Sequence, residues 1–395
     1  MKILLANKFH YPRGGDCIHS MGLEKLLRDA GHEVAFFASK HPQNVASEWQ
    51  SYWVSEFSKK KILRPFGDSE TRRKFTRLLN DFKPDVVHLH NIHTQISPVV
   101  AELAHERGIR VVWTLHDYKL VCPDYLCYTH GKPCEKCITG DKSFCRKNRC
   151  MKGSFLQSLV AQKEAECWNR ERLEACVDAF ICPSEFMKRK MLQGGFEEKK
   201  LHVMHNFVVP FDYAQGAMDI SGIERSRNAR DYYAYIGRLS EEKGIRTLLR
   251  VAAKLSYKLK VLGAGPLESE LKALYTDKPQ IEFLGHCNRE AVIREMVGAR
   301  FTVVPSEWYE VFGLSVVESM SVGTPVLAAK MGGIPELVAP GVNGELFEAG
   351  DEDGLGMKIT EMFEKEYGFE GKLVAERFSP SKYLEGVLGV YGGAA

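Results

Sequence analysis

The sequence contains no apolar run that approaches the roughly 18 residues needed to span a bilayer, so no transmembrane helix is predicted. It also has no internal repeats and no low-complexity tract. The net charge is only +3, which by itself gives no reason to expect a nucleic-acid partner. At its start the chain has four apolar residues in a row before it turns polar, which indicates a first strand rather than a signal peptide.

The composition is that of an ordinary globular protein, with 44% hydrophobic and 27% charged residues. A length of 395 residues predicts two domains, each large enough for its own core. Eleven cysteines are many for a chain without an export signal. Because cytosolic thiols stay reduced, clustered cysteines are more often metal ligands than disulfides. We therefore expect a cytoplasmic protein in which the placement of the cysteines matters more than their number.

Short apolar runs alternate with helical patterns along both halves of the chain, which predicts parallel, doubly wound α/β sheets. The strands expected in the first half are Lys2–Ala6, Glu33–Ala38, Asp85–His90, Arg110–Leu115 and Asp178–Cys182, with a helix over Ile18–Ala30. Those expected in the second half are Tyr232–Ile236, Lys258–Leu262, Ile281–Leu284, Phe301–Val304 and Pro325–Ala328. We predict one Rossmann-like domain over residues 1–208, a second over 209–378 that begins with a polar linker at about 210–231, and a further helix within 379–395.

The most informative segment runs from Pro305 to Glu318 and reads PSEWYEVFGLSVVE. It sets Glu310 and Glu318 eight residues apart across a Phe-Gly step, and a helix is expected behind Gly313. A helix N-terminus offers unpaired N–H groups and a positive dipole end to an anion or a sugar hydroxyl. Glu310 lies just ahead of that helix and Glu318 falls in its second turn, so both carboxylates can serve one ligand.

Two cations, Arg238 and Lys243, stand five residues apart in GRLSEEKG, at a junction between an expected strand and a helix. The carboxyl end of a strand is where open α/β sheets hold ligands. Carboxylates for hydroxyls and cations for phosphates together indicate a site for a sugar nucleotide. Taken singly, these residues also fit surface cations at a helix start, a loop acid and a solvated helix residue.

The ordered set of motifs resembles the retaining glycosyltransferases of family 4. It comprises Glu310-x7-Glu318, Arg238-x4-Lys243, the Gly14-Gly15 loop and the run Gly332-Gly333-Ile-Pro-Glu336. The resemblance covers nearly the whole chain and implies the GT-B fold, in which two Rossmann-like doubly wound domains face each other across a cleft. It also implies that the end segment 379–395 crosses back onto the first domain.

The resemblance implies transfer of a sugar from a UDP- or GDP-sugar to an acceptor hydroxyl, with no cofactor for catalysis. The acceptor expected is a saccharide or a lipid-linked oligosaccharide of surface polysaccharide synthesis. Retention in this family is explained by a front-face path, in which the leaving phosphate helps to deprotonate the acceptor. Other readings remain open: a GT-B sugar-nucleotide epimerase, a phosphorylase, or a zinc-stabilised basic module that binds other partners.

Roles for the second-domain residues come from the same resemblance. Arg238 and Lys243 stabilise the departing diphosphate without a divalent metal. Glu318 binds the ribose hydroxyls and Glu310 a hydroxyl of the transferred sugar, because a carboxylate accepts two hydrogen bonds at once. The backbone N–H groups expected to contact the sugar or phosphates are those of Phe312, Gly313 and Leu314.

Three further positions have weaker assignments. Gly265 lies in GAGP, which lacks the third glycine of a dinucleotide fingerprint and fits either a phosphate approach or a plain turn. His286 ends an expected strand at the corner that holds the base in the family. Gly14 and Gly15 form a loop that reaches the donor phosphate and the acceptor, and glycines there permit positive φ. A simple turn is the alternative.

Histidines gather in the first half. His116 ends an expected strand, and the resemblance makes it a contact for the sugar near the anomeric carbon, in a positioning role. The spacing of His88, His90 and His93, His-x-His-x-x-His, resembles that of metal ligands. Strand alternation, however, places only His88 and His90 on one face of the strand. We therefore expect a core-edge cluster of hydrogen-bonded histidines there.

A cysteine-rich insertion spans residues 122–150 and is polar and basic. Only the pair Cys134-x2-Cys137 has the tight spacing of a zinc knuckle. Because the segment lacks apolar residues for a core, we expect a structural zinc ion, with free thiols or disulfides as alternatives. The insertion follows His116 directly, where it can roof the acceptor pocket. The candidate ligands are Cys122, Cys127, Cys134, Cys137, Cys145 and Cys150.

A second basic run, residues 57–77, has eight Lys or Arg interleaved with apolar residues. Such a segment can lie on an anionic membrane surface. The alternative is a solvated charged face. With a lipid-linked acceptor, the first interpretation puts the protein at the inner face of the cytoplasmic membrane.

Overall fold

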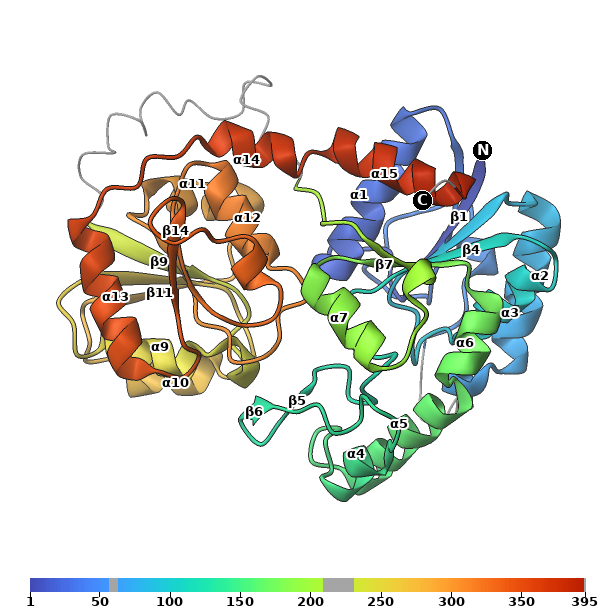
Figure 1. Ribbon diagram of the computed structural model, residues 1–395, viewed down its shortest axis with the longest axis horizontal. Coiled ribbons are helices and arrows are strands. Elements are labelled where there is room, and N and C mark those ends of the chain that lie inside the picture. The colour runs from blue at the N-terminus through green and yellow to red at the C-terminus, as the bar shows by residue number, and fades with distance from the viewer. Residues whose placement is uncertain (57–62, 209–230, 394–395) are drawn as a thin grey trace. The chain divides into compact units, whose positions relative to one another are not determined.

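The computed structural model describes residues 1–56, 63–208 and 231–393. The chain divides into two compact units (Figure 1). The first consists of Met1–Thr129, Cys134–Phe207 and Pro380–Ala395, and the second of His130–Pro133 and Val208–Ser379. Nearly all of the predicted linker, at about 210–231, lies outside the described residues.

The first unit contains a six-stranded sheet in the order β2-β1-β3-β4-β7-β8, in which every neighbouring pair is parallel. Its order reverses beside β1, because β2 lies on one side and β3 on the other. Ligands of open α/β sheets bind outside the carboxyl ends of the strands at such a point. The strands are β1 (Lys2–Ala6), β2 (Glu33–Phe37), β3 (Val86–Leu89), β4 (Arg110–Thr114), β7 (Ala179–Cys182) and β8 (Leu201–Val203).

Successive residues of these strands point to opposite faces of the sheet, and both faces are covered. On one face Ile3 and Leu5 of β1 pack with Leu23 and Leu27 of α1. The other face carries the ring contact between Phe37 and Phe75 of α2, with centroids 5.0 Å apart. The helices are α1 (Gly15–Asp29), α2 (Ser69–Phe82), α3 (Val99–His105), α4 (Ser143–Lys147), α5 (Phe155–Cys167), α6 (Arg170–Cys176) and α7 (Glu185–Gln193).

The last helix, α15 (Pro380–Gly392), belongs to the first unit and lies alongside α1 (Figure 1). Its Tyr383, Val387 and Val390 belong to the same apolar core as α1, on the face of the sheet that α1 covers. The Arg110 side chain donates a hydrogen bond to the Val390 carbonyl at 2.9 Å. The end of the chain is thereby fixed to the first sheet.

The second unit repeats the plan with a parallel six-stranded sheet in the order β11-β10-β9-β12-β13-β14. The order reverses at β9, between β10 and β12, so the carboxyl ends of β9 and β12 mark the ligand position. The strands are β9 (Tyr232–Ile236), β10 (Lys258–Leu262), β11 (Ile281–Gly285), β12 (Thr302–Val304), β13 (Val326–Ala329) and β14 (Gly344–Phe347).

Two apolar clusters cover the faces of this sheet. One joins α9 and α13 to Tyr233, Leu259 and Val303, and the other joins α12 to Val304 and Val326. The α/β class predicted from the sequence is confirmed. The helices are α9 (Ile245–Ala252), α10 (Glu268–Leu274), α11 (Arg289–Gly298), α12 (Leu314–Ser321), α13 (Glu352–Glu364) and α14 (Gly371–Arg377). Across the described ranges, no helix has the length and apolar character that a membrane crossing requires.

Candidate functional site

The carboxyl ends of β9 and β12 bring two predicted residues together. Lys243 follows β9 through a short turn, and Glu310 lies in the loop after β12. Lys243 Nζ lies 2.7 Å from Glu310 Oε1, and the ammonium also lies 4.8 Å from the centroid of the Trp308 ring. The Ser306 hydroxyl donates a second hydrogen bond to Glu310 Oε1 at 2.5 Å. The sheet's reversal point therefore carries a fixed ion pair.

The Glu310 carboxylate of this pair stays ionised although it is buried. Glu310 is 9% exposed. Burial raises the pKa of its carboxyl, but the charge of Lys243 and the hydrogen bonds from Lys243 and Ser306 outweigh burial and hold the pKa below its ordinary value. Both of these hydrogen bonds fall on Oε1.

Two glycines fix the loop that carries Glu310. Gly244 and Gly332 have φ of 67° and 64°, which side chains rarely adopt. A Cβ on Gly244 would lie 1.8 Å from the Pro305 carbonyl oxygen, and one on Gly332 would lie 2.1 Å from the Glu310 carbonyl oxygen. The Gly333 N–H donates to the same Glu310 oxygen at 2.8 Å. The Gly332-Gly333 run thus positions the backbone of Glu310.

Helix α12 begins directly behind this loop, with Gly313 as its N-cap. Leu314 opens the helix, and Phe312 is buried in the core against Phe378. Glu318 lies in the second turn, and burial raises the pKa of its carboxyl while the charge of Arg289 partly opposes that rise. Glu318 is therefore held closer to its neutral form than Glu310.

The other predicted donor residues lie at neighbouring strand ends. Arg238 is exposed after β9, and its carbonyl accepts a 2.7 Å hydrogen bond from Tyr235. Gly265 follows β10, where a Cβ would lie 2.3 Å from the Leu239 carbonyl oxygen, so its turn packs against the Arg238 segment. His286 is exposed directly after β11. No hydrogen bond or ion pair within the described residues joins Glu318 or His286 to the Lys243–Glu310 pair.

In the first unit the Gly14-Gly15 loop begins α1. Neither glycine has the positive φ that their pairing suggested: Gly14 is extended, with φ of −170°. Next to them Asp16 forms an ion pair with Lys8, whose Nζ lies 3.1 Å from its carboxylate. Burial raises the pKa of Asp16, but the charges of Lys8 and His116 lower it by more. The pKa of Asp16 is therefore below its ordinary value.

His116 follows β4 and meets two other histidines. Its Nε2 lies 3.0 Å from Nδ1 of His90, which follows β3, and the two rings stack. His19 of α1 packs edge-on against the His116 ring, with centroids 5.2 Å apart. Burial lowers the pKa of all three, that of His116 to about 4, so they are neutral at pH 7.

The other two histidines of the first-half set behave differently from each other. His88 has both ring nitrogens bonded, Nδ1 at 2.6 Å from the Tyr391 hydroxyl and Nε2 at 2.7 Å from Thr114 Oγ1. It also stacks on His90, with centroids 4.4 Å apart. His93 instead stacks on Trp113. His88 thus matches the expected hydrogen-bonded core histidine, whereas His93 lines a small cavity together with His90 and His116.

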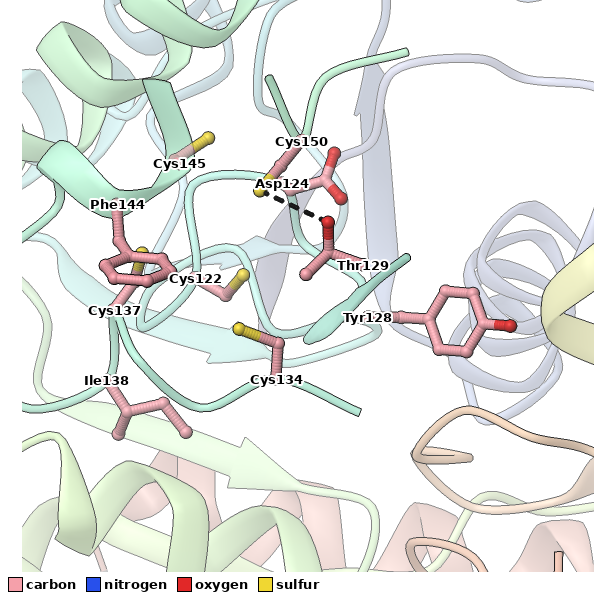
Figure 2. A pocket seen from close by; sticks show the side chains of 10 residues that line it. All are labelled: Cys122, Asp124, Tyr128, Thr129, Cys134, Cys137, Ile138, Phe144, Cys145 and Cys150. Carbon is pink, nitrogen blue, oxygen red and sulfur yellow. Dashed lines mark hydrogen bonds between the residues drawn. The ribbon is translucent and has the colours of Figure 1, made fainter. Parts of the chain in front are cut away.

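The cysteine loop encloses a small cavity of about 10 Å³ (Figure 2). All eleven cysteines are free thiols, so the structure contains no disulfide among them. A hydrogen bond from Cys127 lowers the pKa of the Cys122 thiol to about 7. Throughout the described ranges, no three cysteines bring their sulfurs within 4.8 Å of one another. The cavity is lined by Cys122, Cys134, Cys137, Cys145 and Cys150 together with Asp124, Tyr128, Thr129, Ile138 and Phe144.

Part of the predicted basic run, residues 57–62, lies outside the described residues. In the described remainder, Arg64 is fully buried and pairs with Glu70 at 2.7 Å and Asp68 at 3.1 Å. Phe75 belongs to the core. The exposed cations of α2 are Arg72, Arg73 and Arg77. The run therefore mixes structural and surface charges.

Sequence reasoning missed several residues at both sheet edges. Ser306 and Trp308 stand in the same run as Glu310, four and two residues before it, and their proximity in sequence was the available signal. His19 carried no such signal, because only the packing of α1 on the sheet brings it to His116.

Comparisons with known proteins cover both units. Residues 14–210 match the model of "Glycosyltransferase Family 4", and residues 219–380 match that of "Glycosyl transferases group 1". An uncharacterized glycosyltransferase of Methanocaldococcus jannaschii, MJ1178, is 27% identical over 99% of this chain and 98% of its own.

Two solved structures share the architecture over the full length of both chains. Alr3699/HepE of Anabaena in complex with UDP aligns with a TM-score of 0.70 at 19% identity, covering 100% of each chain. The lipopolysaccharide outer core galactosyltransferase WaaB aligns with a TM-score of 0.67 at 17% identity, again covering 100% of each chain. These likenesses give both units the Rossmann-like form of the GT-B fold.

The two family models meet at the division between the units and together leave out only the first residues, a short segment around residue 214 and the last helix. Each unit has its own six-stranded parallel sheet. The chain belongs to the group 1 glycosyltransferases of family 4 and is a transferase enzyme.

Proposed function

We propose that this enzyme transfers a sugar from a nucleotide-diphosphate sugar to a hydroxyl of a saccharide or lipid-linked acceptor, with retention of configuration. The observation that carries the proposal is the buried Lys243–Glu310 pair at the reversal point of the second sheet. A cation fixed there can stabilise the negative charge of a leaving diphosphate. The Glu310 carboxylate can then accept a hydrogen bond from the transferred sugar.

The remaining donor contacts follow from neighbouring strand ends. Arg238 supplies a second cation, and the N-terminus of α12 at Gly313 supplies N–H groups for phosphate or sugar oxygens. Glu318 serves the ribose hydroxyls and His286 the base. HepE, which shares the fold, has been solved with UDP and glucose and with UDP-glucose, which supports a UDP-sugar as the first donor to test. His116 contacts the sugar from the first unit and has a positioning role.

The acceptor is the less constrained half of the proposal. The shared fold of WaaB, a lipopolysaccharide outer core galactosyltransferase, supports a lipid-linked saccharide. Such an acceptor would bring the protein to a membrane surface, and the exposed Arg72, Arg73 and Arg77 of α2 offer cations to anionic lipids. Co-sedimentation with anionic vesicles tests this contact. It should weaken when Arg72 and Arg73 are both changed to Ala.

Calorimetric titration of the purified full-length protein with UDP- and GDP-sugars tests the donor. Glu310→Gln should weaken binding of the preferred donor, because the amide removes the negative charge that pairs with Lys243 and replaces one of the two acceptor oxygens with a donor. Glu307→Gln is the matched control, since Glu307 lies in the same loop but accepts from Thr247 at 2.5 Å. Failure of every nucleotide sugar to bind, or equal losses in both variants, would contradict the proposal. Proton NMR of the product's anomeric centre decides between retention and inversion.

We further propose that transfer itself requires no metal and that a structural zinc ion is bound in the cysteine loop. The small cavity, which five cysteines of the loop line, supports a metal there, with ligands drawn from those five and Cys127: Cys122, Cys127, Cys134, Cys137, Cys145 and Cys150. Because these sulfurs are not at ligand spacing, binding must draw them together. Purified protein should contain zinc that is lost in the Cys134→Ser/Cys137→Ser variant. Protein without zinc, or a variant that keeps it, would contradict this.

A further inference from the structure

Three histidines from separate elements meet at the carboxyl edge of the first sheet. His19 comes from α1, His90 from the end of β3 and His116 from the end of β4. Each offers one ring nitrogen, and these nitrogens all lie within 4.8 Å of one another. Within the described ranges this is the only group of three or more His, Cys, Asp or Glu ligand atoms with such spacing.

Two nitrogens of this trio have no hydrogen-bond partner. His19 Nδ1 and His90 Nε2 are buried, and neither reaches a donor or acceptor in the described parts of the chain. An unsatisfied buried polar atom costs about 1–3 kcal/mol and requires an explanation, such as a water or an ion. His88 lies two residues before His90, and both of its ring nitrogens have hydrogen-bond partners. The fold can therefore satisfy a buried histidine at this place.

The surroundings also suit a cation. His19 Nε2 lies 3.0 Å from the Tyr383 hydroxyl, which fixes the ring with Nδ1 directed away, as metal-bound histidines are held by an outer partner. Asp16 and Asp117 act on His116 with negative charge that can offset a bound cation, while Lys8, which pairs with Asp16, partly opposes them. His90 and His116 also line a cavity of about 10 Å³, roughly the room for one water-sized sphere.

We propose that His19, His90 and His116 form a binding site for a divalent transition-metal ion such as Zn²⁺ or Co²⁺, and that the bound ion inhibits sugar transfer. Imidazole nitrogens suit these ions, and three of them leave a position for water. A metal on His116 removes that side chain from the sugar. The inhibition rests on the proposed role of His116, whereas the binding does not.

Cobalt titration of chelator-treated, full-length protein tests the binding without any transfer assay. Co²⁺ at three histidines gives visible d–d absorption without the thiolate-to-cobalt charge-transfer band of the cysteine loop, so the two sites are distinguished. We expect one such imidazole site, from which Zn²⁺ displaces Co²⁺. Absorption from thiolate-bound cobalt alone, or no binding, would overturn the proposal and leave water as the occupant of the cluster.

His19→Gln is the decisive variant, because the glutamine amide can keep the hydrogen bond to Tyr383 while the Nδ1 ligand is lost. We expect it to weaken Co²⁺ binding by at least about tenfold. His93→Gln is the control, since His93 lines the same small cavity but stacks on Trp113 and lies outside the group of three ligand nitrogens, so its Co²⁺ affinity should equal that of the wild type. Equal affinity in His19→Gln, with an unchanged unfolding transition, would refute the site.

The inhibition is tested separately. Zn²⁺ should slow transfer in the wild type and in His93→Gln but not the remaining transfer in His19→Gln. If Co²⁺ binds as expected and Zn²⁺ leaves transfer unchanged, the inhibitory role is wrong. If no transfer is found with any donor, the proposed function fails while the cobalt result still stands.

Discussion

The two sheets have the same strand-order plan, but the carboxyl ends of their strands carry different chemistry in two groups of residues: those at the ends of β9 and β12 in the second unit, and those at the ends of β3 and β4 in the first. In the second unit the carboxyl ends of β9 and β12 carry a buried ion pair, Lys243–Glu310, in which the described contacts satisfy both charges. In the first unit the carboxyl ends of β3 and β4 carry neutral imidazoles, and two ring nitrogens of the cluster have no partner within the described residues. One fold plan thus supports either a fixed charge or a neutral polar cluster.

The difference arises from what surrounds each set. Around Glu310, the ammonium of Lys243 and the hydroxyl of Ser306 lie within hydrogen-bond distance, and this outweighs the desolvation cost. Around His116, burial outweighs the negative charges of Asp16 and Asp117, and the pKa falls to about 4. Glu310 is therefore held in its charged form and His116 in its neutral form.

The largest expected effect comes from removing the cation of the second unit. Lys243→Ala should lower kcat for transfer by about 10²–10³, the loss typical for one group that stabilises transition-state charge. Lys260→Ala is the matched control: its ammonium also lies 2.7 Å from a carboxylate, that of Glu295, and over an aromatic ring, that of Tyr232. Steady-state kinetics with the preferred donor should show a loss only in the first variant.

A smaller effect is expected from displacing the backbone of Glu310. Gly332→Ala adds a Cβ 2.1 Å from the Glu310 oxygen at a φ of 64°, whereas Gly350→Ala has a similar φ of 78° with nothing within 4 Å. The left-handed conformation alone costs about 1–2 kcal/mol. Urea unfolding should show that cost for Gly350→Ala and a larger one for Gly332→Ala, and only the latter should slow transfer. Equal costs would mean that the close approach is relieved without strain.

In the first unit the matching test removes a support of the histidine cluster. Tyr391→Phe leaves the buried His88 Nδ1 without its partner, which should cost about 1–3 kcal/mol in the free energy of unfolding. Since His88 stacks on His90 and His90 contacts His116, kcat should also fall, by less than for Lys243→Ala. Tyr52→Phe is the control, because Tyr52 donates to Asp81 at an exposed position and should change neither quantity appreciably.

Regular alternation made most of the sheet predictable. The bounds expected for β1, β9 and β10 are those observed, and the α/β class followed from them. Two strands of the main sheets, β8 and β14, were not predicted. β8 has three residues, and β14 contains Glu345, whose buried charge is paired with Lys358 and Lys365 from a different part of the unit. A charged residue inside a strand interrupts the run of apolar residues by which strands are predicted, unless the side chains that neutralise its charge are known.

The site residues were predictable where each belongs to a short motif with a recognisable spacing. Spacing singled out Glu310 and Lys243, and the fold places them 2.7 Å apart across 67 positions in the sequence. By contrast, the grouping of His19 with His90 and His116 depends on the helix register of α1 and on the adjacency of β3 and β4. Local sequence periodicity predicts neither of these, so the histidine cluster could be identified only from the structure.

The smallest effect sharpens the comparison within the second unit, where Glu310 and Glu318 respond to burial in opposite ways. The folded pKa of Glu310 is lowered, so its contribution to stability is present above the ordinary pKa of 4.5 and is lost as pH falls through the folded value. That of Glu318 is raised, so its contribution is full below 4.5 and is lost as pH rises through the folded value. Urea unfolding should therefore show Glu310→Gln becoming more destabilising, relative to the wild type, as pH rises from below the folded pKa of Glu310 to 4.5, and constant above it. Glu318→Gln should become less destabilising as pH rises above 4.5, and a Glu310→Gln trend in that upper range like that of Glu318→Gln would mean that Lys243 does not decide the charge of Glu310.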